Sequence, residues 1–124
     1  MTIEEEIQAK GKTAPRITPN DIEANIVNEH YFTALQGACV ALLDAAVGGP
    51  NDKSIANTSI SPALGLPTFC VLVLRNGFTV SGESACASPE NFDAEIGCKI
   101  ARTNAVQKIW PLMGYELRSK LAAA

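Results

Sequence analysis

The side chains that could carry out chemistry in this 124-residue chain are few, and they form no catalytic pattern. The single histidine, His30, stands beside Tyr31 and Phe32, where an imidazole is more often structural than catalytic. No nucleophile elbow, phosphate loop, zinc-protease motif or dinucleotide-binding glycine pattern occurs. Metal sites usually contain close cysteine pairs, whereas the four cysteines are widely spaced, at Cys39, Cys70, Cys86 and Cys98. We therefore expect that the cysteines are free thiols, and that the protein binds no metal or cofactor and is not an enzyme.

Binding is better supported, and the segment 66–110 carries most of the evidence. The start of a predicted helix near Asn91 and Asp93 offers unpaired backbone N–H groups and the positive end of a helix dipole. Such a helix start can hold an anion, and the two side chains can read donors and acceptors on a nucleobase or ribose. The alternative is that Asn91 only caps the helix and that Asp93 only serves its dipole.

Four further residues extend this candidate ligand site. Phe78 could stack on a flat ring, and Arg75, Arg102 or Lys108 could contact phosphate. The structural alternative stays open here too, because Arg102 and Lys108 could lie on a solvated helix face.

The elements that must position these residues begin with a predicted hairpin. Residues 68–74 are apolar at nearly every position, which predicts a central strand covered on two sides. Asn76 and Gly77 predict a two-residue turn with positive φ at both positions, which would place Arg75 opposite Phe78. Residues 78–83 alternate between apolar and polar and predict the return strand.

A long helix is predicted after the hairpin. Either Ser88 with Pro89 or Asn91 as the cap could start it, and it is expected to run over residues 93–109. Pro111 should interrupt it, because proline disfavours helical geometry in the preceding residue, and a short last helix is predicted over 114–121. The residues of the long helix that are expected to face the core are Ile96, Ile100, Ala101, Ala105 and Ile109.

The N-terminal half is less regular. Residues 1–17 lack an apolar period and are read as a flexible tail, after which Thr18 and Pro19 predict a helix start. The stretch from Glu29 is ambiguous, because residues 30–33 favour a strand and residues 38–47 favour a helix. Residues 48–52 form a break, and a polar loop is predicted to about Pro62.

Bulk properties predict one domain in the cytosol. The net charge of −3 divides into −4 over residues 1–65 and +1 over residues 66–124, which argues against duplex-DNA binding. No apolar run is long enough for a membrane span, and the acidic N-terminus does not resemble a secretion signal. We expect an α+β fold over residues 18–124, with a small antiparallel sheet around the Asn-Gly hairpin, a long C-terminal helix and a short N-terminal helix.

Three strings together resemble a known family. They are residues 70–86 (CVLVLRNGFTVSGESAC), residues 88–93 (SPENFD) and residues 109–112 (IWPL). Over about Pro15 to Leu121 the chain resembles the small bacteriophage proteins typified by phages N4 and Sf6. The resemblance implies a strand around Tyr31–Thr33 and a variable insertion over residues 34–67.

That family is similar to the Thoeris anti-defence sponges, phage proteins that sequester immune signals made from NAD, namely cyclic ADP-ribose isomers. Some of these sponges also hold cyclic oligonucleotides and form higher oligomers. The resemblance implies that Asn91 and Asp93 match the ligand-reading polar pair and that Phe78 is the aromatic stacker. Lys108 falls near the position of a phosphate-contacting arginine, and no match for an N-terminal arginine is present in residues 29–32.

Two function hypotheses follow. The first is a non-enzymatic, homo-oligomeric sponge in the cytoplasm of the infected bacterium, which holds a cyclic nucleotide without turnover. The second is a host-takeover or inhibitor protein that binds another protein through the hairpin edge or the surface around Trp110 and Tyr115.

Overall fold

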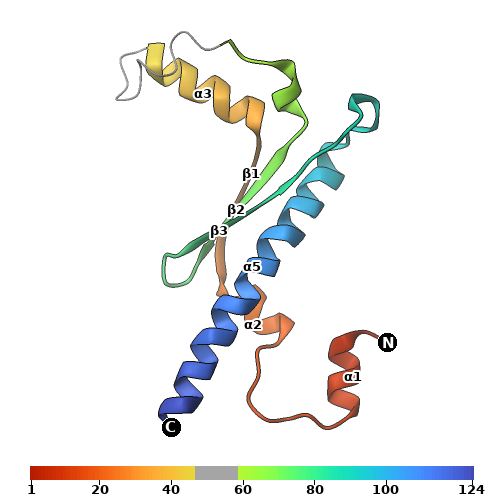
Figure 1. The fold of residues 1–124 in the computed structure, drawn as a ribbon, viewed down its shortest axis with the longest axis vertical. Coiled ribbons are helices and arrows are strands. Elements are labelled where there is room, and N and C mark those ends of the chain that lie inside the picture. The colour runs from red at the N-terminus through yellow and green to blue at the C-terminus, as the bar shows by residue number, and fades with distance from the viewer. Residues whose placement is uncertain (47–58) are drawn as a thin grey trace.

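An antiparallel three-stranded sheet and one long helix make up the centre of the molecule (Figure 1). The computed structural model describes residues 1–46 and 59–124, and the predicted break and most of the predicted polar loop lie outside these residues. The strand order is β1-β2-β3. In chain order the described elements are α1 (Ile3–Ala9), α2 (Pro19–Asn25), β1 (Ile26–Thr33), α3 (Ala34–Ala46), the 3₁₀ turn η1 (Pro62–Gly65), β2 (Thr68–Leu74), β3 (Thr79–Ser84), the 3₁₀ turn η2 (Pro89–Asn91) and α5 (Ala94–Ala123).

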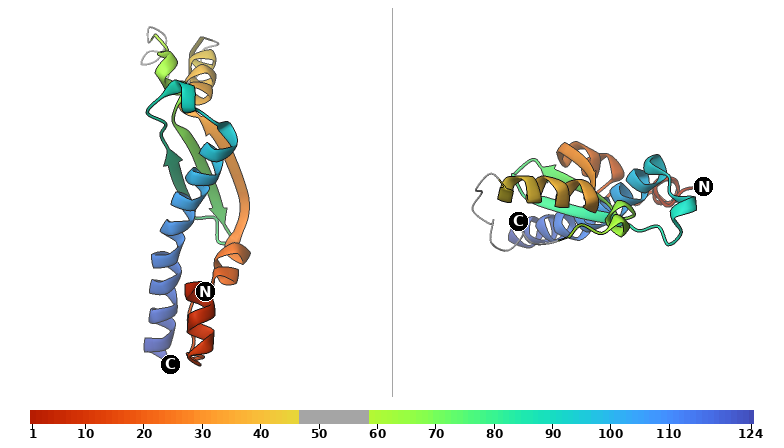
Figure 2. Two further views of the ribbon diagram at one scale, coloured as in Figure 1. Left: turned by 90° about the vertical axis from the view of Figure 1, so that its right-hand side faces the viewer. Right: turned by 90° about the horizontal axis from the view of Figure 1, so that it is seen from above.

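The predicted α+β class is confirmed, and the ambiguous stretch becomes a strand followed directly by a helix. β1 ends at Thr33, whose hydroxyl accepts a hydrogen bond from the Gln36 backbone N–H, while the Gln36 side chain accepts one from Thr33 N–H. This reciprocal pair is the capping-box arrangement that starts a helix at a Thr-x-x-Gln sequence. α3 and η1 lie at the end of the molecule opposite both termini (Figure 2).

The hairpin forms, but its turn differs from the predicted two-residue turn. Only Gly77 has a positive φ there, at 88°, and its N–H donates to the Leu74 carbonyl. The N–H of Leu74 donates to the Phe78 carbonyl, so Leu74 and not Arg75 lies opposite Phe78. This is a three-residue loop with glycine in the left-handed position, in which Asn76 keeps a negative φ and its side chain accepts from Phe78 N–H.

α5 packs on one face of the sheet along a stripe of small residues. Ala101, Ala105 and Ile109 are fully buried against Leu72 and Val80, as predicted for the three helix residues. The prediction that Ile96 and Ile100 face the core is wrong, because they are 55% and 47% exposed. Ile96 precedes Ala101 by five residues, which places the two about 140° apart around the helix.

α5 also continues through the position where a break was predicted. It is one helix of 30 residues with Pro111 inside it. Pro111 is exposed, whereas its neighbours Ile109, Trp110 and Met113 pack in or against the core. The tertiary packing on both sides of the proline therefore outweighs the one backbone hydrogen bond that it removes.

The opposite face of the sheet, which we call the open face, is less covered by the described residues 1–46 and 59–124. β2 alternates between Cys70, Leu72 and Leu74, which are buried under α5, and Phe69, Val71 and Val73, which are half-buried on the other side. The predicted cover on both sides of this strand is therefore wrong within the described chain.

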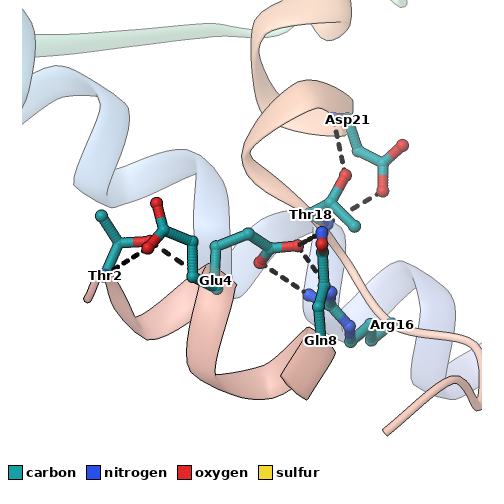
Figure 3. A network of polar contacts seen from close by, with 7 residues as sticks. Thr2, Glu4, Gln8, Arg16, Thr18 and Asp21 are labelled. Carbon is teal, nitrogen blue, oxygen red and sulfur yellow. Dashed lines mark hydrogen bonds and ion pairs between the residues drawn. The ribbon is translucent and has the colours of Figure 1, made fainter. Parts of the chain in front are cut away.

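A short helix, α1, lies within the segment predicted to be a tail. Thr2 and Glu5 form a capping box at its start. Arg16 then holds the helix through two hydrogen bonds to the Glu4 carboxylate, at 2.9 and 2.5 Å (Figure 3). Hydrogen bonding from Arg16 lowers the pKa of Glu4 below its ordinary value. Thr18 and Asp21 form a second capping box, which starts α2 at Pro19 as predicted.

Candidate functional site

The first predicted half-site lies at the N-terminus of α5. The Asp93 carboxylate accepts a hydrogen bond from the Ile96 backbone N–H at 3.0 Å, so Asp93 caps this helix. Asn91 is not the cap. It ends η2, its backbone N–H donates to the Ser88 carbonyl, and the residue is exposed. Both sequence alternatives for the helix start are therefore replaced by a 3₁₀ turn followed by an Asp93 cap.

Asn91 and Asp93 line a small hollow of about 130 Å³. Ser84 and Gly97 also line it, and the Ser84 hydroxyl donates to the Gly97 carbonyl at 2.9 Å. This volume lies below the roughly 300–1,000 Å³ of typical small-molecule pockets. In a single chain the hollow can take one polar group or ring edge, but not a whole nucleotide.

The second half-site is a cleft along the outer edge of β3. Phe78, Lys108 and Tyr115 line it together with Leu112 and Pro111, and its volume is about 580 Å³. We call it the aromatic cleft, because its two rings are 56% exposed (Phe78) and 78% exposed (Tyr115). The structure thus brings together two residues predicted separately, Phe78 and Lys108, and adds a second ring.

Tyr115 was predicted only for the alternative protein-binding surface and not for the ligand site, although the sequence contains a signal for it. Lys108 and Tyr115 are seven residues apart, which is two turns on one helix face, with Leu112 between them. The predicted break at Pro111 assigned them to two different helices. One continuous α5 places both on the wall of the aromatic cleft, two turns apart on one helix face.

Arg75 lies elsewhere, at the tip of the hairpin, where it makes structural contacts. Its guanidinium donates to the Ala24 carbonyl at the end of α2, and its backbone N–H donates to Asn25. It lines an open hollow of about 570 Å³ that also contains the acids Asp21 and Glu116. The nearby carboxylates make this a poor place for phosphate.

Arg102 is engaged in ion pairs between α5 and the β1 side of the molecule. Its Nη2 donates to Glu23 at 2.7 Å and its Nε donates to Glu29 at 2.8 Å. Hydrogen bonding from Arg102 holds the pKa of Glu23 below its ordinary value, and the two carboxylates raise the pKa of Arg102. The structural alternative for Arg102 is therefore favoured over a phosphate contact.

The six predicted residues thus occupy four places. Asn91 and Asp93 share the hollow at the start of α5, Phe78 and Lys108 share the aromatic cleft, and Arg75 and Arg102 lie apart from both. Across residues 1–46 and 59–124, no three side chains of histidine, cysteine, aspartate or glutamate gather where a metal ion could bind. None of the helices in these two ranges has the length and hydropathy to span a membrane.

Comparison with known proteins identifies one relationship. A family model described as "Phage protein (N4 Gp49/phage Sf6 gene 66) family" matches residues 17–121, which is most of the chain. The predicted resemblance to these phage proteins is confirmed by this match. Neither the curated proteins nor the solved structures include a match to this chain.

Proposed function

The chain belongs to this phage protein family, and on that premise we propose that it binds and sequesters a cyclic nucleotide immune signal of the host without converting it. The signal would be a cyclic ADP-ribose isomer, a cyclic oligonucleotide or both. The protein would act as a homo-oligomeric anti-defence protein in the cytoplasm of the infected bacterium. Sequestration requires affinity and abundance, and it needs no catalytic group.

The observation that carries the proposal is the composition of the aromatic cleft. A nucleotide presents a flat ring and a negative phosphate, and here exposed Phe78 and Tyr115 stand in one cleft with the ammonium group of Lys108. Stacking on an aromatic side chain contributes about 1–3 kcal/mol per base. The volume of about 580 Å³ falls within the range of small-molecule pockets.

The hollow beside Asn91 and Asp93 would contribute a second, smaller contact to a ligand that two copies of the chain share, because it lies at the other end of β3 from the aromatic cleft. Asp93 already accepts one hydrogen bond as the helix cap, but a carboxylate has acceptor capacity left for a ligand amino or hydroxyl group. Asn91 is exposed and can both donate and accept.

The test is binding followed by recovery. The protein is dialysed against a panel of cyclic ADP-ribose isomers and cyclic di- and trinucleotides, then denatured, and the released compound is identified by mass spectrometry. We expect at least one member of the panel to be retained and recovered unchanged. Recovery of an altered nucleotide, or retention of none, would contradict the proposal.

Matched variants locate the site. Lys108→Gln should weaken binding about tenfold or more, because a hydrogen bond to a charged group contributes about 1.5–3 kcal/mol. Lys99→Gln is the control, since Lys99 lies on the same helix and pairs with Glu95 at 3.2 Å. Equal losses in the two variants would exclude the aromatic cleft.

The same cleft supports a second candidate, a protein that inhibits a host protein by binding an apolar peptide segment. Tyr115 is exposed enough to serve as an interface anchor, whereas Trp110 packs against the core and is not available for that role. Capture of one host protein in equal amount, lost in Tyr115→Ala and accompanied by no retained nucleotide, would favour this candidate.

A further inference from the structure

We infer that the open face of the sheet is the interface between two copies of this chain, which stack their sheets face to face. The inference rests on the homo-oligomer part of the proposed function and is independent of the ligand. The interface would consist of the side chains that point away from α5 on the three strands. These are Asn28, His30 and Phe32 on β1, Phe69, Val71 and Val73 on β2, and Thr79, Ser81 and Glu83 on β3.

The central strand supplies the apolar middle of this face. Phe69, Val71 and Val73 are as hydrophobic as the residues that β2 buries under α5, yet they stay half-buried in the single chain. Strands with apolar residues on both sides are typical of sheets that are covered on both faces. Phe32 extends the apolar strip, with its ring 5.8 Å from that of Phe69 and itself 38% exposed.

The charges on the face favour a second copy over an unrelated charged partner. Glu83 is its one formally charged residue, and it lies on β3 at the edge of the face, while His30 lies on β1 at the other edge. A twofold axis parallel to β2 places β1 of one copy over β3 of the other. His30 then lies opposite Ser81 and one residue row from Glu83 of the second copy, where an imidazole can donate to a carboxylate. The aligned packing of two sheets is a standard arrangement.

The experiment measures molar mass by light scattering over a dilution series of the full chain, with no nucleotide added. We expect the wild-type protein to show twice 13.1 kDa and Val71→Lys to lose the dimer. Val40→Lys is the matched control, because Val40 is 67% exposed on α3, outside the face. A wild-type monomer at every concentration, or loss of the dimer in Val40→Lys as well, would overturn the inference.

A second variant, at an exposed residue, keeps the test valid if Val71→Lys fails to fold. His30 is exposed in the single chain, so His30→Glu leaves the core untouched while it adds a second carboxylate near Glu83 of the partner copy. We expect a dimer dissociation constant about tenfold higher or more. The double variant His30→Glu/Glu83→Lys should restore much of the affinity. An unchanged dimer in His30→Glu, or no recovery in the double variant, would refute the proposed arrangement. Since nucleotide is absent throughout, this result is independent of the binding panel.

Discussion

The helix and the sheet approach closely at Gly82, and Gly82→Ala should therefore strongly destabilise the protein. A Cβ added at Gly82 would lie 2.2 Å from the backbone nitrogen of Ala105 and 2.4 Å from the carbonyl oxygen of Ala101. Both atoms belong to the helix backbone, so no side-chain rotation can relieve the clash. α5 would have to retreat by about 1 Å, and a gap of that size forfeits up to about half of the dispersion energy of the contacts it opens.

The expected loss of stability follows from the contacts that this retreat of α5 would loosen. The stripe of Ala101, Ala105 and Ile109 on β2 and β3 is the centre of the core. Overpacking alone costs about 1–3 kcal/mol, and with the lost contacts we expect a loss of about 3 kcal/mol or more. Domains are stable by only about 5–15 kcal/mol, so this is a large share of the total. Urea unfolding followed by circular dichroism measures the change.

Gly114→Ala is the matched control, since it adds the same methyl group to α5 itself. A Cβ at Gly114 meets nothing within 4 Å. This substitution should stabilise the protein by about 0.5–1 kcal/mol, because alanine favours a helix over glycine by about that amount. The two variants should therefore shift the unfolding midpoint in opposite directions. If Gly82→Ala unfolded at or above the wild-type midpoint, the close packing of α5 on β3 would be refuted.

Three further predictions concern charge, thiols and capping. Arg102 holds the pKa of Glu23 below its ordinary 4.5. The stabilisation of the folded protein by this ion pair is therefore present above pH 4.5 and is lost as the pH falls through the pKa that Glu23 has in the folded protein. Glu23→Gln should therefore lower the free energy of unfolding by up to about 1 kcal/mol at pH 7 and leave it unchanged in strong acid. Equal losses at the two pH values would contradict the ion pair. Burial raises the pKa of the fully buried Cys70 thiol, so a thiol reagent should modify exposed Cys39 roughly a thousandfold or more faster than Cys70 until denaturant is added. Asp93→Ala should lose about 1 kcal/mol of stability and Asp93→Asn much less, because asparagine also caps helices, and similar losses would argue against the cap.

Local sequence signals predicted the elements whose determinants lie within a few residues. Thr18, Pro19 and Asp21 contain all the groups of the capping box that starts α2, so this start was predictable. β2 likewise follows from a run of β-favouring apolar residues. The existence of the hairpin was predictable from Asn76-Gly77, but its loop length was not. A two-residue and a three-residue loop need the same glycine, and the strand pairing decides between them.

Tertiary packing decided the features that local sequence signals did not predict. Pro111 is a local helix breaker, yet neighbours on both sides pack in or against the core and hold α5 together, and this packing depends on residues far away in the chain. The ion pairs of Arg102 were not predicted, because its partners, Glu23 and Glu29, are more than 70 residues away in sequence. No spacing rule links such distant charges.

The two halves of the candidate site lie too far apart for one small ligand to contact both within a single chain. Phe78 precedes the start of β3 and Ser84 ends it, so the aromatic cleft and the hollow beside Asp93 lie at opposite ends of one strand. Six residues of extended chain span roughly 20 Å, which is longer than a single nucleotide can bridge. Within one chain, Lys108 and Asn91 therefore cannot contact the same small ligand. A bound nucleotide that depends on both residues would have to be shared between copies of the chain, and one that depends on Lys108 alone would sit in the aromatic cleft of each chain.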